Sequence, residues 1–111
     1  MIESYDDLYQ TVSSSVESFL KENDSAEIVV EKKENGTTSM TNKKNGNKLV
    51  LMLGRYSDEY KVGFAFFVTD QYGKASNNPE WIEDVFNHEF DEKFVHILIA
   101  EHLLQTAAAD W

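Results

Sequence analysis

The chain has 111 residues, of which 41% are hydrophobic and 13% aromatic, enough to bury a core as a single domain over residues 1–111. Its 20 Asp and Glu against 10 Lys and Arg give a formal net charge of −10, which repels nucleic-acid phosphates and anionic lipid. The absence of cysteine excludes disulfides, thiolate nucleophiles and Cys-containing metal sites.

The start of the chain is acidic where a signal peptide is basic, and no apolar run approaches the ~20 residues of a membrane span. We therefore expect a cytoplasmic protein that binds neither membrane nor nucleic acid directly. The acids concentrate toward both ends, whereas residues 36–54 hold three Lys and no acid. A field of this kind steers the protein toward basic partners.

The first predicted element is an amphipathic helix. Its apolar residues recur at steps of three and four, which gathers them on one face. They are Ile2, Tyr5, Leu8, Tyr9, Val12, Val16, Phe19 and Leu20. Ser4 followed by Asp7 resembles a capping box at the start, and Asn23 with Asp24 marks the end.

Four strands are predicted next, at residues 28–30, 37–41, 48–53 and 60–69. The connections between them are short, and Asn35 with Gly36 is a strong hairpin signal, so the sheet is expected to be an antiparallel β-meander. The segment 37–41 is almost wholly polar. We expect it to lie at an edge of the sheet or to face solvent on both sides.

The last two of these strands are apolar on both faces. Leu49, Leu51 and Leu53 point to one side, while Val50 and Met52 point to the other. A half-solvated antiparallel strand would alternate between apolar and polar residues. Either helices cover both faces of the sheet, or one face is buried against another subunit or a partner.

Residues 79–107 are predicted to be helical. Asn78 as N-cap with Pro79 at the first helical position is a start signal. A break near residues 88–91 is expected because Asp91 could cap a second helix, and one continuous helix is the alternative. The prediction is thus an α+β fold with an N-terminal helix, a four-stranded antiparallel β-meander and one or two C-terminal helices.

Residues that could carry catalysis are few. In an uninterrupted helix His88, Glu92 and His96 would share one face, a spacing that can place imidazole and carboxylate around a divalent metal. The paired carboxylates lie in polar runs without the desolvation that acid–base catalysis needs, and no phosphate-binding glycine loop occurs. We predict a protein that is not an enzyme and binds no cofactor or metal, with a small metal-dependent enzyme as an alternative.

The acidic residues near the C-terminal segment are the predicted partner-binding site. They are Glu80, Glu83, Asp84, Asp91 and Glu92, with the aromatic residues Tyr72 and Trp81 nearby. Closely spaced carboxylates on a helix can imitate the phosphates of a nucleic acid and occupy a basic groove, and exposed Tyr and Trp are favoured interface anchors.

These residues predict a small acidic protein-binding module. Its partner would be a basic protein, and we expect it to inhibit a nucleic-acid enzyme such as a nuclease, as a phage inhibitor of host defence or a toxin's immunity protein would. One alternative is that the acidity only keeps the protein soluble. Another is a homodimeric structural or assembly protein that buries the second apolar face of the hairpin at residues 49–68.

Overall fold

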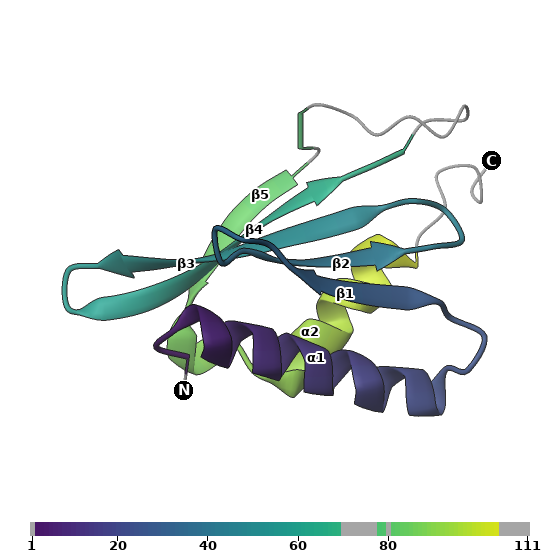
Figure 1. Ribbon diagram of the computed structural model, residues 1–111, viewed down its shortest axis with the longest axis horizontal. Helices are drawn as coiled ribbons and strands as arrows, with labels where there is room; N and C mark the ends of the chain where they lie inside the picture. Colours follow the sequence, from purple (N-terminus) through teal and green to yellow (C-terminus); the bar gives the residue numbers. More distant parts are fainter. Residues whose placement is uncertain (1, 70–77, 80, 105–111) are drawn as a thin grey trace.

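The computed structural model describes residues 2–69, 78–79 and 81–104, which form two helices and an antiparallel sheet (Figure 1). The elements are α1 (Tyr5–Glu22), β1 (Ile28–Lys32), β2 (Thr38–Asn42), β3 (Lys48–Tyr56), β4 (Glu59–Phe67), β5 (Trp81–Phe86), the 3-10 turn η1 (Asn87–Glu89), α2 (Glu92–Leu98) and the π-helical turn η2 (Ile99–Leu103). The strands follow one another in the order β1-β2-β3-β4-β5, each antiparallel to the next. The predicted α+β class and the antiparallel meander are confirmed.

Helix α1 begins and ends where the sequence predicts. The Ser4 hydroxyl accepts a hydrogen bond from the Asp7 amide at 3.0 Å, and the Asp7 carboxylate accepts one from the Glu3 amide at 3.1 Å. The first bond satisfies a helix amide that has no partner within the helix, and the second reaches Glu3, one residue before the N-cap, rather than Ser4 as in a standard capping box. At the other end Asn23 is the C-cap, and its side-chain amide donates to the Phe19 carbonyl at 3.0 Å.

The hairpin between β1 and β2 forms at the predicted place. Gly36 has φ +95°, and its amide donates to the Lys33 carbonyl at 2.9 Å. Asn35 does not share the positive φ that a two-residue turn would require, so the loop is longer than the sequence suggested. A Cβ at Gly36 would lie 2.7 Å from the Tyr5 ring, so the glycine also allows α1 to pack on the turn.

Strand β2 differs from the prediction. It lies inside the sheet between β1 and β3, and four of its five residues are buried: Thr38, Ser39, Met40 and Asn42. Pairing on both sides satisfies its backbone, and the Asn42 amide donates to the Leu103 carbonyl at 2.7 Å. Polar side chains therefore did not indicate exposure here. The expectation of an edge or solvated strand is wrong.

The segment predicted to begin the C-terminal helix is instead a fifth strand. Residues 81–86 pair with β4 in antiparallel register, from Phe66 opposite Trp81 to Lys61 opposite Phe86. Aromatic and β-branched residues suit a pleated surface, and the far edge of β4 was available to pair with them. The prediction of four strands and of a helix start at Asn78 and Pro79 is corrected accordingly.

A single C-terminal helical segment follows the 3-10 turn. Asp91 is the N-cap of α2, and its carboxylate accepts a hydrogen bond from the Phe94 amide at 2.8 Å, so the predicted cap is confirmed. The helix continues directly into η2. Within the described residues, no helix is long and apolar enough to cross a membrane.

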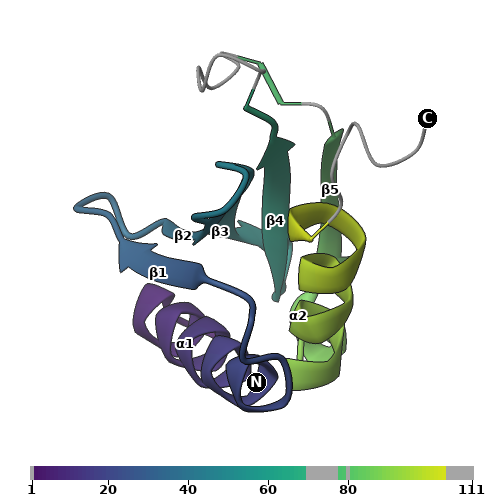
Figure 2. The same ribbon diagram turned by 90° about the vertical axis from the view of Figure 1, so that its right-hand side faces the viewer.

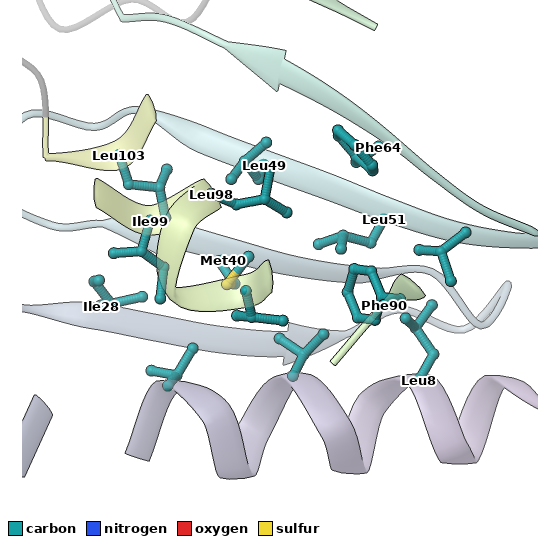
Figure 3. Close-up of a cluster of buried hydrophobic side chains, with 14 of the residues drawn as sticks. Leu8, Ile28, Met40, Leu49, Leu51, Phe64, Phe90, Leu98, Ile99 and Leu103 are labelled. Atoms are coloured by element: carbon teal, nitrogen blue, oxygen red, sulfur yellow. The ribbon is translucent and has the colours of Figure 1, made fainter. Parts of the chain in front are cut away.

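Both helices pack on the same face of the sheet (Figure 2). Figure 3 shows Leu8 of α1 and Leu98, Ile99 and Leu103 of the C-terminal segment around Met40, Leu49 and Leu51 of the sheet. The opposite face carries the exposed side chains of Val29, Met52 and Ile82. The sequence allowed either helices on both faces of the sheet or one face buried against another subunit or a partner. Among the described residues, helices cover only one face.

Candidate functional site

The charged residues are divided unequally between the two layers of the fold. Residues 2–27 and 87–104, which contain the helices, hold eleven Asp and Glu against two Lys. Residues 28–69 and 81–86, which contain the strands, hold six acids against seven bases. The helical segments thus have a net charge of −9 and the strands with their turns +1. We call the exposed acids of the helical segments the acidic helical layer.

The members of the acidic helical layer come from both ends of the chain. All of them are exposed: Glu3, Asp6, Asp7, Glu17, Glu22, Asp24, Glu27, Glu89, Asp91, Glu92 and Glu101. Helices α1 and α2 pack against each other on one face of the sheet, which brings the acids of both chain ends into the same layer of the fold (Figure 2). The sequence shows that both ends are acidic, but only the packing of α1 beside α2 joins them.

A cluster of polar contacts joins the two helices. The Ser18 hydroxyl donates to Glu92 Oε1 at 2.6 Å, and His96 Nε2 lies 2.9 Å from the Ser15 carbonyl oxygen and 3.0 Å from Ser18 Oγ. The Phe19 ring and the imidazole meet in a T-shaped arrangement, with centroids 5.4 Å apart and an interplanar angle of 70°. These contacts hold α1 and α2 together.

The same cluster does not form a nucleophile with its base. A backbone carbonyl can only accept, so His96 Nε2 carries the proton and donates it to the Ser15 carbonyl. That nitrogen has no lone pair with which to take a proton from the Ser18 hydroxyl, as activation of a serine requires. The contacts between Ser18, Glu92 and His96 are therefore structural.

The three residues of the predicted metal alternative are not brought together. His88 lies in η1, stacked on the Phe86 ring and 3.9 Å from a Glu89 carboxylate oxygen. Glu92 and His96 lie beyond the cap of α2 and contact Ser18. In the part of the chain that the structure describes, no group of three or more His, Asp or Glu is placed to hold a metal ion. The 3-10 turn removes the helical spacing on which the alternative depended.

The predicted partner-binding residues occupy different parts of the fold. Glu83 and Asp84 are neighbours on β5 and so point to opposite faces of the sheet. Glu83 is close enough to His102 to affect its pKa, while Asp84 Oδ1 lies 3.1 Å from Lys61 Nζ. Asp91 and Glu92 belong to the acidic helical layer. Glu80 and Tyr72 lie outside the described residues.

Trp81 packs at the seam between β5 and the C-terminal segment. Its indole stacks on the His102 imidazole with centroids 4.3 Å apart and an interplanar angle of 23°, and it also meets the Phe64 ring at 5.0 Å. Burial lowers the pKa of His102, and the nearby carboxylates of Glu101 and Glu83 oppose that shift. Trp81 is half-buried in this cluster.

A partly open depression lies near the turn between β3 and β4. It is lined by Glu3, Arg55, Asp58, Glu59, Tyr60, Asn87 and His88. Its ionisable side chains are mostly exposed to water, whereas general acid–base catalysis depends on a desolvated group. Asn87 is buried there, but its amide already donates to the Ile2 carbonyl at 3.0 Å.

No protein-family model matches the chain, and no curated protein or solved structure resembles it significantly. The functional argument therefore rests on the residues and geometry of this chain.

Proposed function

We propose that the protein is an acidic binding module that uses the acidic helical layer to occupy a basic surface of another protein. The partner class that fits best is a nucleic-acid enzyme such as a nuclease, because its substrate groove is built to hold a row of negative charges. Inhibition would be steric and electrostatic, and it needs no catalytic residue in this chain.

The separation of charge between the two layers is the observation that supports this proposal. Acids that serve only solubility can be spread over the whole surface. Here the helical segments have a net charge of −9 and the strands with their turns +1. A one-sided field of this kind orients the molecule as it approaches a basic partner and raises the association rate.

Two residues of the layer are best suited to meet such a partner. Glu17 and Glu22 are exposed on α1, and neither makes a hydrogen bond or ion pair with the described residues. Asp7, Asp91 and Glu92, in contrast, already accept hydrogen bonds from within the chain. Glu17 and Glu22 can therefore be changed with the least disturbance of the fold.

The test begins with affinity capture from a cell lysate at about 50 mM and about 500 mM NaCl, a range over which surface charge is strongly screened. Association of the captured protein is then measured with the double variant Glu17→Lys/Glu22→Lys. We expect the association rate at low salt to fall at least ~10-fold, and inhibition of the captured enzyme to fall with it.

The matched control is Glu31→Lys/Glu34→Lys, which makes the same change of charge on β1 and the turn that follows it. Both residues are exposed, so the fold should tolerate the change. The control should leave association nearly unchanged. If both double variants slow association equally, net charge alone is responsible; if neither does, the acidic helical layer is not the binding surface.

A further inference from the structure

The sheet face turned away from the helices is apolar at its centre. The strand register places Val50 opposite Ala65 and Ala65 opposite Ile82 in one row, with Met52 opposite Gly63 in the next. Side chains in such rows share one face of the sheet. We call the following residues the open-face patch: Val50, Met52, Gly63, Ala65, Phe67 and Ile82. Ile82 is 69% exposed and Met52 50% exposed.

The open-face patch is uneven because small and large side chains alternate across it. The nearest side-chain atom to a Cβ at Gly63 would be Met52 Cγ at 3.5 Å, and a Cβ at Gly54 would meet nothing within 4 Å. A low strip of Gly63 and Ala65 on β4 thus runs between the larger side chains of Met52 on β3 and Ile82 on β5, and Gly54 lies next to Met52 along β3. Small residues of this kind allow another backbone or side chain to approach closely.

The charges around the open-face patch favour one class of partner. The six patch residues are uncharged, but the strand register places Asp84 opposite Gly63, Lys61 opposite Gly54 and Lys48 opposite Phe67 on the same face. Lys61 Nζ lies 3.1 Å from the Asp84 carboxylate of the same chain, so these charges largely balance. A basic protein is attracted to the acidic helical layer instead, and an acidic protein is repelled by the net charge of −10. A second copy that presents the same nearly charge-balanced face keeps both acidic helical layers on the outside of the dimer.

We infer that the open-face patch is the interface of a two-fold symmetric homodimer in which the sheets of two copies pack face to face. In such an interface the same residues meet from both sides, so the larger side chains of each copy can pack onto the low strip of the other. Packed sheets lie ~10 Å apart, with their inner side chains interdigitated. This inference is independent of the partner bound by the helical layer.

The available area indicates how strong the dimer should be. The patch lies on three strands, β3, β4 and β5. At a spacing of ~4.8 Å, with about eight residues at ~3.3 Å each, they give a face of roughly 400 Å² per copy. The total, about 800 Å², is in the range of weak, transient interfaces. We therefore expect reversible association in the micromolar range.

Sedimentation equilibrium of the full chain from about 1 µM to about 1 mM tests the inference. The dimer should persist or strengthen between about 50 and 500 mM NaCl, because salt screens the repulsion between two acidic copies. Ile82→Lys should weaken it at least ~10-fold, since each interface would have to desolvate two unpaired ammonium groups. Circular dichroism of the variant shows whether the fold is retained.

The control variant is Ile97→Lys. Ile97 is also an exposed isoleucine, at 42%, but it lies on α2 in the helical layer. This change should leave dimerisation unaffected or slightly improved. A wild-type chain that stays monomeric over the whole range overturns the inference, and so does equal weakening by both variants.

The lack of cysteine permits a second, independent measurement. Ala65→Cys places a single thiol in the open-face patch, whereas Ser14→Cys places one on the exposed face of α1. With a short thiol-reactive cross-linker, the Ala65→Cys chain should form covalent dimers at least ~10-fold faster than the Ser14→Cys chain. Equal rates would place the dimer contact elsewhere and contradict the inference.

Discussion

A single hydroxyl in the centre of the sheet offers a direct test of the core. Thr38 is fully buried on β2, and its Oγ1 is the one buried side-chain oxygen or nitrogen among the described residues without a hydrogen-bond partner. A buried polar group without a partner costs about 1–3 kcal/mol. We predict that Thr38→Val, which has the same shape, raises the free energy of unfolding by about 1 kcal/mol, seen as a higher urea midpoint at unchanged slope.

The control for this prediction is Thr38→Ser, which keeps the hydroxyl and removes the methyl group. It should destabilise the protein by about 1 kcal/mol, because buried methyl contacts are lost. A Thr38→Val protein that is less stable than the wild type would mean that the hydroxyl is hydrogen-bonded in solution.

His102 makes stability depend on pH. Burial against Trp81 and Phe66 lowers its pKa below the ordinary value of 6.5, so the folded chain binds this proton less readily than the unfolded chain. Its contribution to stability is therefore complete above pH 6.5 and is lost progressively as the pH falls below that value. We predict that His102→Phe, which keeps an aromatic ring, flattens the decrease in stability between about pH 7.5 and 5.5, as measured by urea unfolding.

A second variant tests the cause of the shift. Glu83→Gln removes one of the two carboxylates that oppose the lowering, so an NMR titration should find the pKa of His102 lower still. An unchanged pH dependence in His102→Phe would assign the acid sensitivity to other groups.

At the scale of elements, the joint between the helices depends on one imidazole. His96 donates to the Ser15 carbonyl at 2.9 Å and packs in a T-shaped arrangement with the Phe19 ring. We predict that His96→Ala lowers the free energy of unfolding by about 1–2 kcal/mol, from the lost hydrogen bond and ring contact. His88→Ala serves as the control, because the His88 side chain is 54% exposed and its loss should cost less than about 0.5 kcal/mol. Equal losses of unfolding free energy in the two variants would show that the His96 contacts do not stabilise the packing of α1 against α2.

The elements that the sequence predicted correctly are those set by local interactions. The limits of α1 depend on contacts three or four residues apart, from Ser4 to Asp7 and from Phe19 to Asn23, and the Asp91 cap is equally local. The spacing of Trp81, Ile82, Val85 and Phe86 fits a helix face, but these residue types also suit a strand. Their pairing with β4 reaches some 15–25 residues back along the chain, and no local pattern contains that contact.

The candidate site was less predictable than the fold for the same reason. The acidity of both chain ends is visible in the sequence, and Asp91 and Glu92 belong to the surface proposed here. The mistaken helix placed Glu83 and Asp84 on one face, whereas a strand separates them. The open-face patch was expected in part, because β3 and β4 are apolar on both sides. Which face the helices leave uncovered depends on tertiary packing.

At the scale of the whole molecule, concentrating the acids in one layer has a cost in stability. Eleven carboxylates against two ammonium groups repel one another in the folded state and are farther apart when the chain unfolds. Salt screens this repulsion, with a Debye length that falls from about 30 Å at 10 mM to about 8 Å at 150 mM. Thermal unfolding should therefore shift upward as NaCl rises from about 10 mM to 500 mM.

The expected size of this salt effect is about 1 kcal/mol, which is ~4–8 °C for a domain of about 100 residues. Glu17→Lys/Glu22→Lys should melt at a higher temperature than the wild type at 10 mM NaCl and depend less on salt, because it relieves the repulsion directly. Glu31→Lys/Glu34→Lys changes the nearly neutral layer and should give no such gain. NaCl is the appropriate salt, since sulfate stabilises folded proteins by exclusion from their surface whatever their charge. A melting temperature that falls with NaCl would mean that attractive ion pairs outweigh the repulsion among the helical acids.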